Sequence, residues 1–250
     1  MANYHFEVNN IGRRKHKSLA KLVNYITGYS IYDSRNKKTY NAERSDVLYH
    51  GIFLPDNAPK EFMDIQKLCT KIDEAEHRVD ARTAREFIGS LPNELCEDDI
   101  EKIVLDFISK NFISCGLAAI AAIHNGRNET DPAKNNPHVH ILVTTRRVTP
   151  DGLSKEKFRD FDRFEYIDIW RESWAEIQNQ AYRNRGLDIE ISCKSLDEQG
   201  IERKPIKRLS LTDWQREKRG ERTVDGDINR AIKERSRREE QREQDIELSR

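Results

Sequence analysis

The chain has 250 residues, of which 36% are hydrophobic and 35% charged, and its 44 Lys and Arg residues balance its 44 Asp and Glu residues. This composition excludes a disordered chain and allows one sizeable core with an appendage. No apolar run approaches the length of a membrane span, and Met1–Glu7 lacks the apolar stretch of a signal peptide. We therefore expect a cytoplasmic protein without membrane insertion. The cysteines are widely separated, which predicts neither a disulfide framework nor a zinc knuckle: Cys69, Cys96, Cys115 and Cys193.

Charge is unevenly distributed along the chain. Residues 1–50 contain nine Lys and Arg against four Asp and Glu, whereas residues 51–110 contain eight against fourteen. A polyanion would therefore meet mainly the first fifty residues. A solvated basic loop would give the same count, so the pattern alone does not establish a nucleic-acid partner.

The first half of the chain alternates predicted strands and helices. Tyr4–Val8 alternates apolar and polar residues, as a short strand does, and a basic loop is expected over Asn9–Lys17. Ser18 is a suitable N-cap for a helix that carries Tyr25 and ends near Gly28. The further predicted strands are Asp46–Leu54, Ala84–Ser90 and Leu117–Ile123, and the predicted amphipathic helices are Glu61–Arg78 and Asp98–Phe112.

In the second half, a loop over Asn125–Asn135 leads into a strand within Asn136–Arg147. Ile167–Arg183 reads as an amphipathic helix, Asp188–Ser192 as a short strand candidate, and Asp227–Leu248 as a charged, solvated helix. Together these elements predict an α+β fold, in which a largely antiparallel sheet has helices packed on its faces. We place one domain at residues 1–208 and a charged helical C-terminal tail at residues 209–250.

Three histidines form the most informative pattern in the sequence. His138 and His140 are two residues apart on a predicted strand, so they project from one face while Val139 turns into the opposite layer. His124 ends the preceding strand, which a hairpin-like loop would place beside the first. Three neutral imidazoles with open positions are typical of a catalytic metal site. A chance H-x-H pair would need no metal, so the pair alone does not establish the site.

Six stretches of the sequence carry a wider pattern. They are K-L-V-N-Y-I at Lys21–Ile26, Y-H-G-I-F-L-P at Tyr49–Pro55, A-R-E-F-I-G-S-L-P at Ala84–Pro92, A-A-I-H with H-V-H-I-L-V-T at Ala121–Thr144, W-R-E-S-W-A at Trp170–Ala175, and Q-G-I-E-R-K-P at Gln199–Pro205. These stretches resemble segments of the MobA/MobL-type relaxases and occur in the same order as in that family. The resemblance covers roughly residues 1–210. These relaxases are HUH endonucleases that nick plasmid DNA at a transfer origin, so the resemblance implies an HUH relaxase-like fold.

The resemblance implies metal-dependent nicking at a specific site and strand of the DNA. Relaxases of this kind use a tyrosine near the N-terminus as nucleophile, and the matching position here is Tyr25. Its phenol oxygen would attack the scissile phosphodiester, giving a 5′-phosphotyrosyl adduct and a free 3′-OH, and the reverse attack would rejoin the strand. Because a phenol has a reference pKa of about 10, a cation held by His124, His138 and His140 would help by neutralising the developing charge. Mn²⁺ or Mg²⁺ is expected in function, although Zn²⁺, Co²⁺ or Ni²⁺ also suits three imidazoles.

Two further residues are considered for the reaction. The resemblance points to Glu86 as an acidic partner that would orient an imidazole or accept a proton, with a plain surface glutamate on an edge strand as the alternative. The sequence departs from the family at a second acidic position, where Ile88 stands. Tyr29 follows Tyr25 by one helical turn, the spacing of two-tyrosine replication initiators, but we interpret it as a packing residue.

The resemblance implies single-stranded DNA at a transfer origin as the partner, in a bacterial cytoplasm, together with accessory relaxosome proteins and a type IV coupling protein. The candidate phosphate contacts flank the helix of Tyr25 and the strand of His138, although each is equally well explained as a solvated basic residue: Arg13, Arg14, Lys15, Lys17, Arg146 and Arg147. The alternative functions are a rolling-circle replication initiator or HUH transposase, a non-catalytic origin-binding regulator, and a metallohydrolase that merely shares H-x-H.

Overall fold

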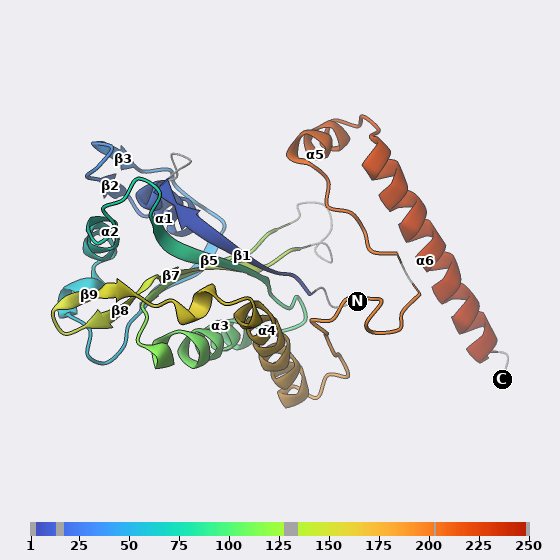
Figure 1. Ribbon diagram of the computed structural model, residues 1–250. Coiled ribbons are helices and arrows are strands. Elements are labelled where there is room, and N and C mark those ends of the chain that lie inside the picture. The colour runs from blue at the N-terminus through green and yellow to red at the C-terminus, as the bar shows by residue number, and fades with distance from the viewer. Residues whose placement is uncertain (1–3, 14–17, 128–134, 203, 249–250) are drawn as a thin grey trace. The chain divides into compact units, whose positions relative to one another are not determined.

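The computed structural model describes residues 4–13, 18–127, 135–202 and 204–248 (Figure 1). Its centre is an antiparallel sheet in which five of the described strands follow the order β1-β5-β7-β6-β4. The predicted α+β fold with a largely antiparallel sheet is confirmed. The strands are β1 (Phe6–Gly12), β4 (Val47–Phe53), β5 (Arg82–Ser90), β6 (Ala119–His124) and β7 (His138–Thr144).

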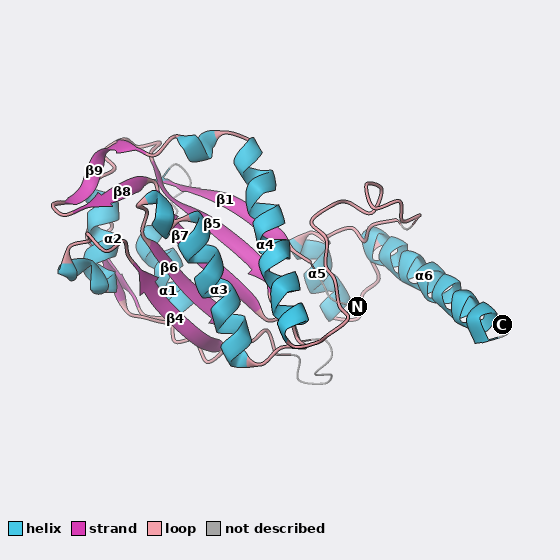
Figure 2. Cartoon of the chain, turned by 90° about the horizontal axis from the view of Figure 1, so that it is seen from below, coloured by secondary structure: helices cyan, strands magenta, loops and turns pink. Residues whose placement is uncertain are grey.

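Helices cover both faces of this sheet (Figures 1 and 2). α3 (Glu97–Asn111) and α4 (Glu165–Asn184) pack on one face, and α1 (Leu19–Thr27) and α2 (Ile65–Glu74) pack on the other. Because side chains alternate along a strand, each strand supplies both layers. The predicted arrangement of helices on the faces of the sheet is therefore correct.

The layer under α3 and α4 is aromatic and tightly packed. Phe87 of β5 lies 4.9 Å from the ring of Trp170, and Trp174 lies 5.0 Å from Phe107, measured between ring centroids. A Cβ atom at Gly89 would come within 2.6 Å of Trp174, so glycine lets the indole rest directly on β5. This layer has no room for larger side chains and stabilises the sheet by burying apolar area.

Helix α1 begins and ends where its sequence predicts. The Ser18 side chain accepts a hydrogen bond from the backbone N–H of Lys21, which caps the first turn. Gly28 has φ of 75°, the left-handed conformation that ends helices. These two caps fix which residues occupy the last turn of α1, including Tyr25 and Ile26.

Two predicted boundaries and one predicted strand are wrong. β1 continues through Gly12, because its later residues pair with β5, so the expected basic loop does not begin at Asn9. The helix predicted over Glu61–Arg78 is shorter: a 3₁₀ turn precedes Asp64, which caps α2 by accepting from the N–H of Lys67, and α2 ends at Glu74. The described segment Asp188–Ser192 is irregular, because Asn179 of α4 pairs with both backbone groups of Ile191 at 2.8 Å, in place of a strand.

Several short elements were not predicted. Two small hairpins, β2–β3 and β8–β9, lie outside the main sheet, and α5 follows the domain. Each strand has six residues or fewer, which is too short for a clear alternation. Their bounds are β2 (Ile31–Asp33), β3 (Lys38–Tyr40), β8 (Arg146–Thr149), β9 (Gly152–Lys157) and α5 (Leu211–Lys218).

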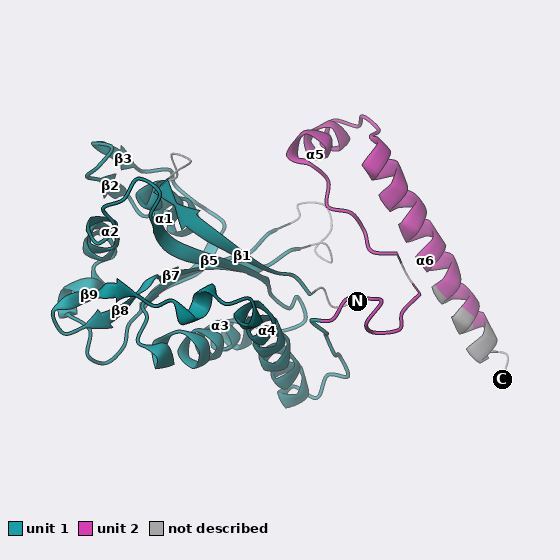
Figure 3. Ribbon diagram, viewed as in Figure 1, with its two compact units in different colours: residues 1–193 teal, residues 194–250 magenta. Residues whose placement is uncertain are grey.

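By internal contacts the chain divides into two units, Met1–Cys193 and Lys194–Arg250 (Figure 3). The second unit contains α5 and α6 (Val224–Leu248), whose ion pairs include Arg230 with Glu217 and Arg238 with Glu234. The charged helix predicted over Asp227–Leu248 is thus present. The functional division into residues 1–208 and 209–250 stays a prediction.

None of the described helices has the length and apolar character needed to cross a membrane.

Candidate metal centre and nucleophile

The three histidines converge on one face of the sheet. His124 of β6 is the cross-strand partner of His138 on β7, and His140 follows two residues later on the same face. The three ring centroids lie 4.9 to 5.3 Å apart, and one nitrogen from each ring lies within 4.8 Å of the others. The β6–β7 hairpin therefore brings together the three residues that sequence spacing selected.

Each imidazole is anchored through one of its two nitrogens. Nε2 of His124 donates to the carbonyl of Ile26 at 2.7 Å, and Nδ1 of His138 donates to the carbonyl of Asn136 at 2.8 Å. Nδ1 of His140 faces Oε1 of Glu86 at 3.1 Å. Since these oxygens only accept, the bonds assign a proton to the anchored nitrogen and leave a lone pair on the other. Three oriented lone pairs are what a divalent metal requires, so these residues fit such an ion.

The lowered pKa values of His124 and His138 agree with this donor set. Burial lowers the pKa of His124 from its ordinary value of 6.5 to about 4, and burial also lowers the pKa of His138. A cationic imidazole is disfavoured in each case, because the charged form loses its hydration and faces neighbouring histidines. His124 and His138 are therefore neutral near pH 7, and each has a lone pair available.

A close backbone contact fixes the base of the hairpin. The N–H of Asn136 donates to the carbonyl of Gly126 at 3.0 Å, and Gly126 has φ of 53°. A Cβ atom at position 126 would lie 1.9 Å from the carbonyl oxygen of Asn136, so only glycine allows this approach. The same Asn136 carbonyl anchors His138, and Gly126 therefore positions a candidate metal ligand through the backbone.

Glu86 lies beside the cluster. It is 7% exposed and belongs to β5, an interior strand of the described sheet, so the alternative of a surface glutamate on an edge strand is wrong. Its carboxylate accepts from His140, as an orienting partner would. Ile88, which replaces the second acidic residue of the family pattern, is the direct cross-strand partner of His140.

The phenol of Tyr25 lies on the same side of the sheet as the histidines. Its ring centroid is 6.1 Å from that of His140, at an interplanar angle of 90°, and the residue is 51% exposed. The next residue in α1, Ile26, supplies the carbonyl that anchors His124. The last turn of α1 thus carries the candidate nucleophile and holds a candidate ligand at once.

Arg44 lies against both Tyr25 and His124, and the sequence analysis did not identify it. Its guanidinium lies 4.5 Å from the centroid of the Tyr25 ring and donates two hydrogen bonds to Asp46, at 2.8 and 2.6 Å. The hydrogen bond to Asp46 raises the pKa of Arg44, with a smaller contribution from Tyr25.

Nη2 of Arg44, one of the two nitrogens that donate to Asp46, also lies 3.4 Å from Nδ1 of His124. A metal ion would take that lone pair, while the two bonds to Asp46 would still hold Arg44. The only local sequence signal for Arg44 is its R-x-D spacing with Asp46, and this spacing is too common to identify a functional residue.

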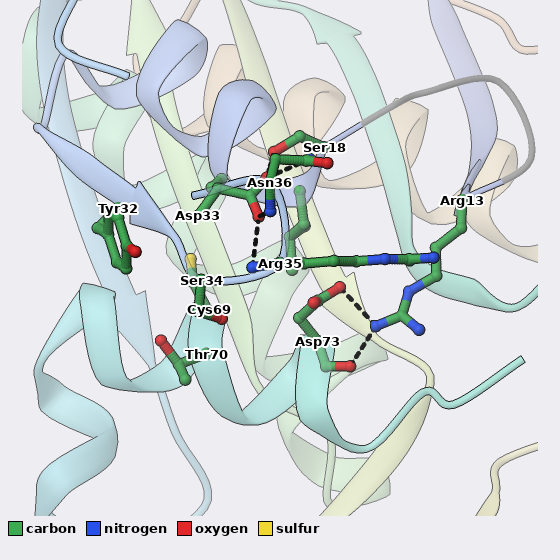
Figure 4. Close-up of a pocket in the computed structure, with 12 residues that line it drawn as sticks. Arg13, Ser18, Tyr32, Asp33, Ser34, Arg35, Asn36, Cys69, Thr70 and Asp73 are labelled. Atoms are coloured by element: carbon green, nitrogen blue, oxygen red, sulfur yellow. Dashed lines mark hydrogen bonds and ion pairs between the residues drawn. The ribbon is translucent and has the colours of Figure 1, made fainter. Parts of the chain in front are cut away.

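The described basic residues proposed as DNA contacts are bonded to the protein itself. Arg13 lines a small pocket at the other end of α1 and pairs with Asp73 at 2.7 Å (Figure 4). Arg146 pairs with buried Glu76 at 2.8 Å, and Arg147 donates to the carbonyl of Cys115 at 3.0 Å. These bonds hold each guanidinium against the protein but use only part of its five N–H donors, so the role of these three residues in DNA contact stays a prediction. Arg14, Lys15 and Lys17 lie outside the described residues.

The fold and the cluster define an α+β protein with three imidazoles suited to one divalent ion. The MobA/MobL family model matches residues 17–219, and the chain therefore belongs to the MobA/MobL family, as the sequence resemblance predicted.

Named relatives and a solved structure agree with this assignment. A probable mobilization protein MobA from Bifidobacterium longum is 31% identical over 213 residues, which are 85% of this chain and 34% of that protein. A mobilization protein MobL from Acidithiobacillus ferridurans is 27% identical over 237 residues, covering 84% of this chain and 62% of that protein. A structure describing the molecular basis of vancomycin resistance transfer in Staphylococcus aureus has 25% identity and a TM-score of 0.69, over 77% of this chain and 98% of that chain. The chain spans about a third of the MobA relative.

Proposed function

We propose that residues 1–208 form the nicking domain of a plasmid-mobilisation relaxase, which cuts one strand of DNA at a transfer origin. The observation that carries the proposal is the placement of the Tyr25 phenol beside His140, on the helix turn that anchors His124. Membership of the MobA/MobL family supports the substrate class, because its named relatives are mobilisation proteins. A core-facing tyrosine would instead be buried, whereas Tyr25 is half exposed.

In the proposed reaction the phenol oxygen of Tyr25 attacks the scissile phosphorus, and the bond to the 3′ oxygen breaks. The phosphate stays on the tyrosine as a 5′-phosphotyrosyl ester, while the departing oxygen takes a proton to become a 3′-OH. The ester conserves the energy of the broken phosphodiester, so attack by a 3′-OH rejoins the strand without another energy source.

His124, His138 and His140 would hold the divalent ion, for which Mn²⁺ or Mg²⁺ is our assignment. When bound, such an ion neutralises charge on the non-bridging phosphate oxygens and orients the phosphate. Glu86 and the carbonyls of Ile26 and Asn136 keep the three rings in one orientation, which reduces the reorganisation needed at the moment of attack.

Arg44 would act on the nucleophile directly. Its guanidinium over the Tyr25 ring favours negative charge on the phenol oxygen, and Asp46 fixes the guanidinium in that place. As the DNA partner we propose single-stranded DNA at the origin, joined by accessory relaxosome proteins and a type IV coupling protein. Phosphate contacts from Arg13, Arg14, Lys15, Lys17, Arg146 and Arg147 belong to the same proposal.

The test is a covalent-adduct assay. The protein is incubated with Mn²⁺ and labelled single-stranded oligonucleotides that tile the transfer origin of its plasmid, and the products are separated on a denaturing protein gel. We expect a labelled protein band that Tyr25→Phe abolishes. Tyr32→Phe is the matched control, since Tyr32 is also half exposed but lines the pocket at the opposite end of α1.

The other outcomes contradict the proposal in distinct ways. Cleavage without a labelled protein band indicates a metallohydrolase, and binding without cleavage indicates an origin-binding regulator. An adduct that survives Tyr25→Phe but is lost in Tyr29→Phe would assign the reaction to the second tyrosine.

A further inference from the structure

An open cavity of about 270 Å³ lies between the end of α1 and strand β4, and we call it the α1–β4 pocket. Its walls include Tyr29, His50, Ile52, Met63, Ile65 and Ile120. Neither the metal centre nor the proposed nucleophile uses any of these side chains.

The α1–β4 pocket is close to the histidine cluster. In the sheet register His50 of β4 pairs with Ala122 of β6, and Ala122 pairs with His140 of β7. The three side chains therefore form one row on the same face, and two strand spacings separate His50 from His140, roughly 10 Å. A DNA strand with its scissile phosphate at Tyr25 can place a neighbouring nucleotide at this distance.

The walls of the pocket suit a flat, neutral ring. Tyr29 is 46% exposed, and its ring meets that of His50 with centroids 4.8 Å apart at 64°. Met63 is 65% exposed, although it is apolar, and three isoleucines also line the pocket. None of the described residues that line the pocket is Lys, Arg, Asp or Glu, so a phosphate has no counter-charge there.

The aromatic wall is held in place before any ligand arrives. Buried Asn24 donates from Nδ2 to the carbonyl of Tyr29 at 2.8 Å, and the N–H of Tyr29 donates to Oγ1 of Thr27 at 3.2 Å. The backbone is thus fixed while the ring remains half exposed, which lowers the entropy lost when a ligand stacks on it.

Strand β4 adds hydrogen-bonding groups beside the pocket. It is the edge of the sheet among the described strands, so no neighbouring strand pairs with its outer backbone groups there. The imidazole of His50 also has donor and acceptor nitrogens. A nucleobase combines a stacking face with a polar edge, and both have counterparts here.

We propose that the α1–β4 pocket binds one nucleobase of single-stranded DNA close to the scissile phosphate, stacked on Tyr29 and Met63. The proposal rests on the proposed function, because it takes the strand presented to Tyr25 as the ligand. It assigns Tyr29 to substrate binding through its ring, whereas the sequence reading made it a packing residue.

The experiment compares two probes that share phosphates and differ in bases. Fluorescence anisotropy measures binding of a labelled 20-nucleotide thymidine tract and of an abasic tract of equal length, both in EDTA so that no cleavage occurs. We expect the wild type to prefer the thymidine tract. Tyr29→Ala and Met63→Ala should each reduce that preference by roughly tenfold, and Tyr29→Phe should retain it, because the ring face and not the hydroxyl makes the contact.

Tyr32→Ala is the matched control, since Tyr32 is 45% exposed but lies in a different pocket. All the substituted side chains are at least 45% exposed, so folding should be retained, and thermal melts verify this. Equal binding of both tracts by the wild type overturns the proposal. So does an unchanged preference in Tyr29→Ala and Met63→Ala, or an equal loss in Tyr32→Ala.

The adduct assay separates this proposal from the proposed function. If the Tyr25 adduct forms but the pocket substitutions leave the base preference unchanged, only the proposed base-binding role of the pocket is contradicted. If the base preference depends on Tyr29 but no adduct forms, the pocket is supported as a DNA subsite and only the proposed nicking reaction is contradicted.

Discussion

The two faces of the central sheet carry different chemistry on the same strands. On β7, Val139, Ile141 and Val143 enter the aromatic layer under α3 and α4. The alternate residues His138 and His140 point to the side of α1. The first face is packed mainly with apolar and aromatic groups, with buried Arg85 as an exception, while the other holds buried imidazoles and a carboxylate. The stable packing of the aromatic face allows the opposite face to hold polar groups in a fixed arrangement, although burying those groups costs free energy.

Substitutions at neighbouring residues of β7 should affect the two faces differently, with the largest effect at His140. We expect His140→Ala to abolish nicking, because it removes a metal ligand, while affinity for the origin oligonucleotide stays mostly intact. His77→Ala, at an exposed histidine outside the cluster, is the control. The adduct gel and an anisotropy titration measure the two quantities, and wild-type nicking by His140→Ala would remove the metal from the mechanism.

Ile141→Ala should have the opposite signature. Ile141 is fully buried in the aromatic layer, so its truncation should lower the free energy of unfolding by about 2–5 kcal/mol. Urea denaturation measures the loss, and Mn²⁺ titration at low temperature should show unchanged affinity per folded molecule. A selective loss of metal binding with unchanged stability would mean that the two faces are not separable.

Glu86→Gln tests how the histidine face is organised. The amide preserves the shape of the side chain but replaces the charged acceptor of His140, and such changes around a metal ligand cost about 10–100-fold in metal affinity. Isothermal titration with Mn²⁺ measures this, with Glu74→Gln on the surface of α2 as the control. If Glu86→Gln and Glu74→Gln bind Mn²⁺ equally well, the carboxylate does not orient the ring.

The smallest expected effect concerns the pH dependence of stability without metal. The pKa of His124 in the folded protein is about 4, below the ordinary 6.5, so the unfolded chain binds more protons between these values. Stability should therefore fall as pH is lowered from 6.5 to 4, with a contribution from His124 on the order of 1 kcal/mol for each pH unit in that window. Urea titrations in EDTA at several pH values measure it. A His124→Gln variant should show a flatter profile, and an identical profile would contradict the assigned pKa.

Much of the fold and part of the site could be predicted from local pattern. The cap at Ser18, the glycine that ends α1, and the alternation of β7 each depend on residues a few positions apart, and each is confirmed. The strand candidate at Asp188–Ser192 was wrong because the side chain of Asn179 on α4, 12 positions earlier, pairs with the backbone of Ile191 in place of a strand. The proposed DNA contacts of Arg13 and Arg146 stay predictions, since sequence reasoning did not reveal their acidic partners Asp73 and Glu76.

The sequence alone predicted the main strands and helices, the family and the presence of three histidines on neighbouring strands. Only the tertiary structure decided how those histidines are held and which residues meet the candidate nucleophile. His124 is 98 positions from its anchor at Ile26 and 80 from Arg44, and His140 is 54 from Glu86. Periodicity reports neighbours within a few residues, whereas these contacts follow from placing β5 beside β7 and α1 across the sheet, which depends on packing of the whole core.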